Sequence, residues 1–171
     1  PGARKGDRGR LLVIGGGPYH GAPMLAGMAA ARSGCDLVHV AMPSKAASRC
    51  EWPNSIIPEE LPDGDLLTMS STASIGAFTQ SGRRPDSIVI GPGLGRDERT
   101  IEAVKAILGM ATEQGIPIVV DADALGALPR GKWPRGMTGV ATPHEAEASR
   151  WLGEADPSEA LSECLEEDST I

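Results

Sequence analysis

Residues 87–123 read SIVIGPGLGRDERTIEAVKAILGMATEQGIPIVVDAD, and this stretch decides the fold class. An aliphatic run at 87–90 predicts a buried strand that ends in a glycine-rich turn. Residues 97–114 then carry apolar side chains at helical spacing, and Gly115 suits the left-handed end of a helix. A second aliphatic run at 117–120 predicts the next strand. The side chains expected on the buried face of the helix are Ile101, Val104, Ile107, Leu108 and Ala111.

The same alternation of strand and helix appears on both sides of this stretch. Further strands are expected at 11–14, 36–42, 55–58 and 139–141, and further helices at 21–32, 72–79 and 158–167. Aliphatic strands that alternate with helices predict an α/β domain with a mostly parallel sheet, helices on both faces and three layers. In such a sheet the carboxyl ends of the strands form the ligand crevice.

Composition restricts the partners of the chain. Its formal net charge of −7 argues against nucleic acid, whose phosphate backbone is itself anionic. No apolar run approaches the roughly 18 residues of a membrane span. Cys35, Cys50 and Cys164 are odd in number and lack paired spacing, which predicts neither a disulfide framework nor a zinc site. We therefore expect a cytoplasmic protein without a membrane segment.

Two glycine-rich turns follow predicted strands, at 15–22 and 91–95. The first either brings a phosphate or sugar to the amides of a helix start or is only a tight turn that needs glycine. It matches neither the dinucleotide nor the P-loop signature, because His20 and Ala22 stand where these signatures need Gly and Lys. The second turn leaves one rim bare of side chains, which favours flat contact with a ligand. Asp97 is expected to cap the helix beyond it.

Acidic residues end the strand at 117–120. Asp121 and Asp123 are two residues apart, so their side chains can point to the same side and hold a cation or orient a hydroxyl. Alternatively, one of the two caps the turn that follows.

A helix start is predicted where the sequence reads TPHEAE from Thr142. Thr142 is the expected N-cap, and Glu145 is expected to reach back to it as a capping box. His144 then lies in the first turn at the edge of the crevice, where its imidazole either binds a ligand or is structural. Glu147 faces either the site or the solvent. His39, inside a strand, is expected to be a satisfied core residue or a half-buried one.

Taken together, five motifs resemble the NAD(P)H-hydrate dehydratase family, which has a ribokinase-like fold. The match follows the family's order and covers a little over half of its domain. The motifs are Lys5-Gly6-Asp7-Arg8-Gly9, Gly15-Gly16 with Tyr19 and Gly21-Ala22-Pro23, Gly91 to Gly95, Asp121-Ala122-Asp123-Ala124-Leu125, and Thr142-Pro143-His144.

The resemblance implies a reaction in which ADP or ATP, with Mg²⁺, phosphorylates the hydroxyl of hydrated NAD(P)H. Phosphate then leaves, and the nicotinamide ring is restored. The resemblance implies substrate-binding positions at Ala22, at Gly93 or Gly95, and at His144, and substrate- or metal-orienting roles for Asp121, Asp123, Glu147 and Tyr19.

The family's Gly-x-Gly-Asp helix start supplies the catalytic Asp and an anion hole, and it has no counterpart before Ile171. We therefore expect residues 1–171 to be the N-terminal, substrate-side part of one ribokinase-like domain, truncated at its C-terminus and inactive alone. Two alternatives stay open: a kinase of a small vitamin precursor or sugar, and a non-catalytic binding fragment. A homo-oligomer and an NAD(P)H-hydrate epimerase domain upstream are further partners to be tested.

Overall fold

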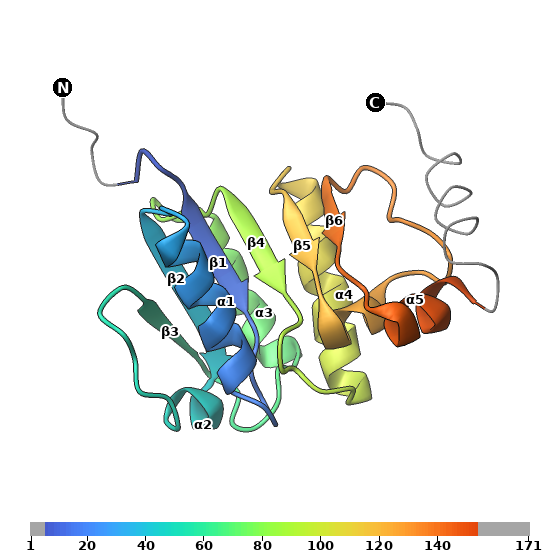
Figure 1. The fold of residues 1–171 in the computed structure, drawn as a ribbon, viewed down its shortest axis with the longest axis horizontal. Helices are drawn as coiled ribbons and strands as arrows, with labels where there is room; N and C mark the ends of the chain where they lie inside the picture. The colour runs from blue at the N-terminus through green and yellow to red at the C-terminus, as the bar shows by residue number, and fades with distance from the viewer. Residues whose placement is uncertain (1–5, 154–171) are drawn as a thin grey trace.

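The structure, a computed structural model, describes residues 6–153. Its strands are β1 (Arg10–Ile14), β2 (Leu37–Pro43), β3 (Ile57–Leu61), β4 (Ser87–Ile90), β5 (Ile118–Val120) and β6 (Gly139–Ala141). Its helices are α1 (Gly21–Arg32), α2 (Ser44–Ala47), α3 (Met69–Thr79), α4 (Glu98–Glu113), the 3₁₀ helix η1 (Ala122–Ala127) and α5 (Glu145–Leu152). The strands form one sheet in the order β3-β2-β1-β4-β5-β6, and every neighbouring pair is parallel (Figure 1).

The sheet is the middle of three layers. Helix α1 lies in front of it, and α3 and α4 lie side by side behind it (Figure 1). Side chains of β1 alternate between the two faces: Val13 packs with Met24 of α1, whereas Leu12 and Ile14 pack in the larger core with Ile107 of α4. The predicted fold class, a parallel sheet with helices on both faces, is confirmed.

Helix α4 follows its sequence pattern closely. Asp97 is the N-cap, and its side chain accepts a hydrogen bond of 3.0 Å from the amide of Arg99. Gly115 has φ +61°, the left-handed conformation expected after the last turn. Four of the five expected core side chains are buried and Ile101 is half-buried, which confirms the predicted stripe.

Segments with a weaker sequence pattern differ from the prediction. The strand expected at 55–58 lies at Ile57–Leu61, because β3 is an edge strand whose acidic side chains interrupt the apolar pattern. Helix α3 starts three residues before the expected 72, and the short helices α2 and η1 were not expected. The helix predicted at 158–167 lies outside the described residues. Within residues 6–153, no helix is long and apolar enough to cross a membrane.

His39 of β2 is a satisfied core residue, as expected. It is 3% exposed, and its Nδ1 lies 2.8 Å from Oε1 of Glu59 on β3. The same Glu59 oxygen accepts a hydrogen bond of 3.1 Å from Arg83, whose guanidinium stands over the ring of Phe78. This cluster ties the edge strand to α3.

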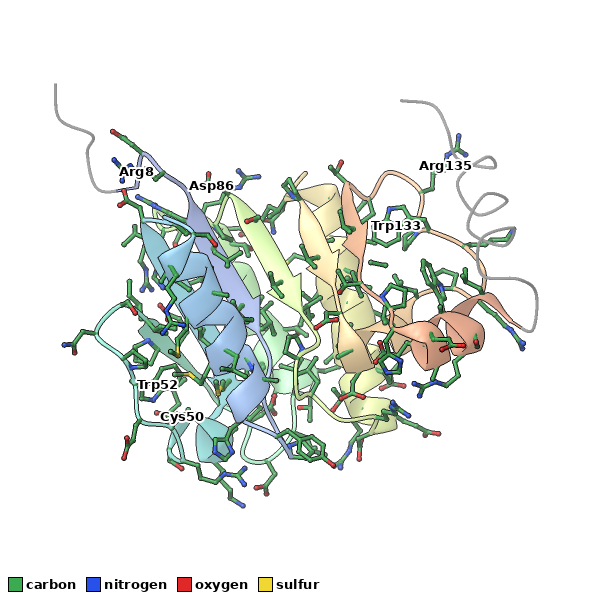
Figure 2. All side chains as sticks on the ribbon, in the orientation of Figure 1. Arg8, Cys50, Trp52, Asp86, Trp133 and Arg135 are labelled. Carbon is green, nitrogen blue, oxygen red and sulfur yellow. The ribbon has the colours of Figure 1, made fainter. Side chains whose placement is uncertain are left out.

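An acidic side chain links two strands at the side of the sheet where the strands begin. Asp86, which lies with Arg8 at the top of Figure 2, accepts a hydrogen bond of 2.8 Å from the amide of Arg10. This bond fixes the start of β1 against the start of β4. The turns described in the next subsection lie at the opposite side of the sheet, where the strands end.

Asp63 organises the start of α3. It is 8% exposed and accepts hydrogen bonds from the amide and hydroxyl of Thr68, at 2.8 and 2.6 Å, and from the hydroxyls of Ser70 and Ser71. Burial acts to raise the pKa of Asp63, but the hydrogen bonds from Ser70, Ser71 and Thr68 outweigh it and lower the pKa. The carboxylate therefore stabilises the fold in its charged form.

The substitution Asp63→Asn tests this role. At neutral pH it is expected to lower the free energy of unfolding by about 1–3 kcal/mol, because an amide cannot accept all of these donors. A lowered pKa in the folded state contributes stability above the unfolded value of about 3.9 and loses it as pH falls through the folded pKa. The difference between the two proteins should therefore shrink below about pH 4, as measured by urea unfolding.

Asp65→Asn is the matched control, because Asp65 pairs with Lys45 on the surface, where both side chains are about two-thirds exposed. Its effect should stay under about 0.5 kcal/mol. Equal losses from the two substitutions would contradict the assignment.

Gly91 permits the closest approach between two strand ends. Its φ is +129°, and a Cβ at this position would collide with the carbonyl oxygen of Asp121 at the end of β5. The turn after β4 therefore lies directly against the backbone that follows β5. No residue with a side chain fits here without displacing that backbone.

Gly91→Ala is expected to lower the free energy of unfolding by about 2 kcal/mol or more, through strain and backbone displacement. Gly109→Ala is the control, since Gly109 lies inside α4 and a Cβ there meets nothing within 4 Å. It should raise stability by about 0.5–1 kcal/mol. Thermal unfolding of both variants measures the contrast, and an unchanged Gly91→Ala would refute the packing argument.

Candidate functional site

The turns after β1 and β4 touch along their backbones. The amide of Gly16 donates a hydrogen bond of 2.9 Å to the carbonyl oxygen of Pro92. A Cβ on Gly15 would collide with the same oxygen. Because β1, β4, β5 and β6 are neighbours in the sheet, the turns that follow them adjoin in the same order.

The second contact between these turns involves Gly93 and Tyr19. A Cβ on Gly93, whose φ is +71°, would collide with the carbonyl oxygen of Tyr19. The side chain of Tyr19 is 68% exposed. Ala22 is also exposed, in the first turn of α1. Gly15, Gly16 and Gly93 are themselves buried, so the exposed part of this edge is formed by residues such as Tyr19 and Ala22.

Asp123 links the turn after β4 to η1. Its Oδ2 accepts a hydrogen bond of 3.0 Å from the amide of Gly95, and its Oδ1 lies 3.0 Å from Nε of Arg96. Both carboxylate oxygens therefore have donors, one of them cationic. This arrangement holds the glycine-rich turn in place.

Asp121 links β5 to β6. Its Oδ1 accepts a hydrogen bond of 2.8 Å from the hydroxyl of Thr142, just after β6. Neither Asp121 nor another side chain caps η1 by a hydrogen bond, so the capping alternative is wrong for Asp121.

These contacts do not suit Mg²⁺ at the acidic pair. The cation prefers free carboxylate oxygens and phosphates, whereas Arg96 and the Gly95 amide already engage Asp123. Among residues 6–153, no group of three or more His, Cys, Asp and Glu side chains could hold a metal ion. The geometry favours loop linkage over cation binding for this pair.

The start of α5 differs from the prediction. His144 is the N-cap in place of Thr142: its Nδ1 accepts a hydrogen bond of 3.2 Å from the amide of Ala146. Glu147, and not Glu145, completes the capping box, with its Oε2 3.0 Å from the amide of His144. The Thr142 hydroxyl is bound to Asp121, and the helix begins two residues later than expected.

Glu147 also holds the imidazole of His144. Its Oε1 lies 3.3 Å from Nε2 of His144, and an accepting Nδ1 leaves the ring proton on Nε2. The His144 side chain is 65% exposed, whereas that of Glu147 is only 12% exposed. Glu147 is thus a positioning residue behind an accessible histidine.

The four turns form one connected surface, which we call the carboxyl rim. Its links run from the β1 turn to Pro92, from Gly95 to Asp123, and from Asp121 to Thr142. His144 lies two residues beyond the last link. Sequence reasoning missed the roles of Thr142 and Arg96, although an arginine directly after the glycine-rich turn offered acidic Asp123 an obvious partner.

Comparison with known proteins places this chain in a family. The family model for NAD(P)H-hydrate dehydratase matches residues 11–169. The bifunctional NAD(P)H-hydrate repair enzyme Nnr of Pyrobaculum aerophilum is 39% identical over 94% of this chain and 31% of its own length. The ADP-dependent (S)-NAD(P)H-hydrate dehydratase of Cenarchaeum symbiosum is 36% identical over 92% of this chain and 53% of its own.

The ATP-dependent enzyme of Emericella nidulans is 40% identical over 71% of this chain and 35% of its own length. The hypothetical protein SMU.573 from Streptococcus mutans, at a TM-score of 0.71 and 23% identity, covers 96% of this chain and 58% of its own, and shares the fold. The chain spans 28% to 53% of the curated relatives that match nearly all of it. It belongs to the NAD(P)H-hydrate dehydratase family.

Proposed function

We propose that this chain supplies the substrate side of a nucleotide-dependent NAD(P)H-hydrate dehydratase. The observation that carries the proposal is the carboxyl rim, a connected set of turns that exposes the side chains of Tyr19, Ala22 and His144. A connected edge of this kind suits the hydrated nicotinamide ring. The polar group at its end suits the carboxamide or hydroxyl of that ring.

The proposed reaction removes water in two steps. ADP or ATP transfers a phosphoryl group to the hydroxyl oxygen of the hydrate, which makes that oxygen a good leaving group. The carbon–oxygen bond then breaks, phosphate leaves, and loss of a proton from the neighbouring carbon restores the ring double bond. Mg²⁺ would neutralise the nucleotide phosphates during the transfer. The described residues bind and orient the hydrate, and we assign them no part in phosphoryl transfer.

His144 is the residue that we expect to contact the hydrate. Its side chain is 65% exposed, so an acceptor on the substrate can reach Nε2–H and share it with Glu147, which lies 3.3 Å from Nε2. Glu147 keeps the ring oriented toward that acceptor. Gly93 and Gly95 pack against Tyr19 and Pro18, so they hold the turn after β4 in place beside the exposed residues of the β1 turn.

The names of the relatives extend the proposal. Some are ADP-dependent and some are ATP-dependent, so either nucleotide is the expected phosphoryl donor. Others are bifunctional repair enzymes, which makes an NAD(P)H-hydrate epimerase activity in the same protein a further expectation.

Replacing the rim histidine tests the binding role. In the product of the complete gene that encodes this chain, His144→Ala should lower kcat/KM for NADH hydrate by about tenfold or more, mainly through a higher KM. Recovery of NADH absorbance measures the reaction. Glu145→Gln, exposed on the same turn, is the control and should act as the wild type.

The positioning role of Glu147 needs a separate comparison. Glu147→Ala should raise KM in the same direction as His144→Ala, whereas Glu147→Gln should restore part of the loss, because glutamine still accepts from the His144 amide. A Glu147→Ala variant with unchanged kinetics would contradict the role.

Residues 1–171 by themselves should not dehydrate NADH hydrate with either ADP or ATP. Phosphoryl transfer needs positioned charge and amides around the transferred group and a base for the hydroxyl proton. The sequence up to Ile171 contains no Gly-x-Gly-Asp helix start to supply them. Activity of the isolated chain would overturn this expectation. Phosphorylation of a vitamin precursor by the complete gene product, without action on the hydrate, would favour the kinase alternative.

A further inference from the structure

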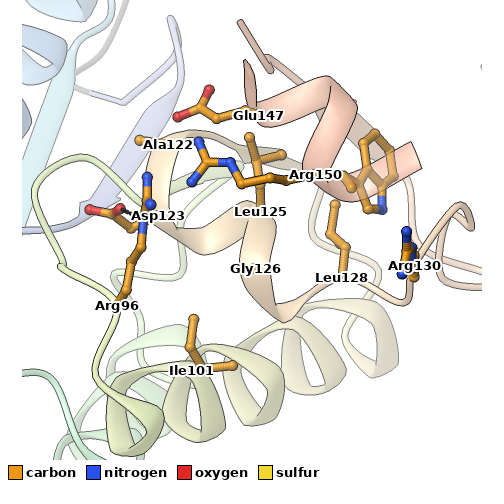
Figure 3. Close-up of a pocket in the computed structure, with 11 residues that line it drawn as sticks. Arg96, Ile101, Ala122, Asp123, Leu125, Gly126, Leu128, Arg130, Glu147 and Arg150 are labelled. Carbon is orange, nitrogen blue, oxygen red and sulfur yellow. Dashed lines mark hydrogen bonds and ion pairs between the residues drawn. The ribbon is translucent and has the colours of Figure 1, made fainter. Parts of the chain in front are cut away.

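A pocket of about 390 Å³ lies beneath α5, between that helix, η1 and the start of α4 (Figure 3). Its size is within the usual range of small-molecule sites. Ile101, Leu125, Leu128 and Trp151 give it an apolar lining. The pocket is built from three segments that are distant in the sequence. Ala122, Asp123 and Leu125 of the acidic motif line it, but none of the substrate-binding positions given above does.

Three arginines line the same pocket: Arg96, Arg130 and Arg150. Arg96 shares the carboxylate of Asp123. Arg150 donates from Nε to the carbonyl oxygen of Ala146, and its guanidinium points over the pocket toward η1 (Figure 3). Within residues 6–153, neither Arg130 nor Arg150 forms an ion pair with a carboxylate.

The two acidic side chains in the lining do not compensate these charges fully. Asp123 is held by the Gly95 amide and Arg96, and Glu147 by the amide and ring of His144. Both carboxylates therefore bind groups of the carboxyl rim. An apolar floor with two arginines not paired to carboxylates is complementary to an organic anion, above all a phosphate ester with an aromatic base.

The pocket adjoins the carboxyl rim. Asp123 and Glu147 line the pocket and also contact Gly95 and His144 of the rim. A dinucleotide whose nicotinamide ring lies on the rim needs a place for its other half. That half carries an aromatic purine and phosphates, which match the lining of the pocket.

We propose that this pocket binds the phosphate-bearing adenylate half of the NAD(P)H hydrate, with Arg130 and Arg150 contacting its phosphates. The inference rests on the proposed function, because it takes the hydrate as the substrate. It adds a second binding region that lies beneath α5 and outside the positions at Ala22, Gly93, Gly95 and His144.

A truncated substrate tests the assignment in the complete gene product. For the wild type, the hydrate of reduced nicotinamide mononucleotide, which lacks the adenylate half, should have a KM at least about tenfold above that of NADH hydrate. The double variant Arg130→Met and Arg150→Met should raise KM for NADH hydrate to near that of the truncated substrate, with kcat little changed. Methionine keeps an apolar side chain of similar length.

The matched control removes the same charge elsewhere. Arg32→Met with Arg135→Met changes two exposed arginines that do not line the pocket, and the tenfold ratio should persist. The proposal would be overturned if the ratio of the two KM values stayed near tenfold in the Arg130 and Arg150 variant. It would also be overturned if the control variant lost that ratio to the same extent.

A binding measurement separates this proposal from the proposed function. AMP should bind residues 1–171, as followed by calorimetry, and the Arg130 and Arg150 variant should bind it at least about tenfold more weakly. If neither the wild type nor any variant dehydrates either hydrate, but AMP binding still depends on the two arginines, the adenylate site stands and only the proposed dehydratase function is wrong. If AMP does not bind, or binds both proteins equally, the pocket assignment fails whatever the enzyme does. AMP that competes with ADP but not with the hydrate would assign the pocket to the nucleotide donor instead.

Discussion

Direct backbone contact between the turns at the carboxyl edge is the constraint on which the site depends. The turn after β4 touches the turn after β1 at Gly15 and Gly93 and the end of β5 at Gly91, and none of the three positions has room for a Cβ. A parallel sheet brings strand ends to one edge but does not by itself bring their turns into contact. The glycines do so, because each lies where the neighbouring backbone leaves no room for a side chain.

Polar side chains then fix these turns relative to one another. Asp123 and Asp121 each join neighbouring segments, to Gly95 and Thr142, and this use of their oxygens leaves the acidic strand end poorly suited to a metal. Similarly, the carboxylate of Glu147 accepts a hydrogen bond from the His144 amide at the start of α5 and contacts the ring of His144. The exposed His144 and Tyr19 are thus polar side chains of the rim that remain for substrate, and Glu147 orients His144.

The sequence predicted the features that depend on local pattern. The aliphatic strands and the amphipathic α4, with its Asp97 cap, were expected because burial on one or two faces imposes a periodicity. The start of α5 was predicted two residues too early, because Thr142 was expected to cap the helix. Its hydroxyl instead binds Asp121, which lies 21 residues away in the sequence. The pocket beneath α5 was not foreseen for the same reason, since its lining converges only through the packing of α5 on η1 and of η1 on α4.

Asp123 and Glu147 form a wall that the rim and the pocket share. A ligand in the pocket can therefore affect the contacts that these two residues make with the rim. The pair between Arg96 and Asp123 is open to solvent on the arginine side, because the Arg96 side chain is 62% exposed whereas that of Asp123 is 18% exposed. A phosphate in the pocket can therefore reach Arg96 while the Gly95 amide still holds the other oxygen of Asp123. The pair between His144 and Glu147 has the same pattern, with an exposed ring and a carboxylate that is 12% exposed and bound to the His144 amide. On both sides of the rim the exposed partner can therefore adjust to a ligand while a backbone amide holds the carboxylate in place.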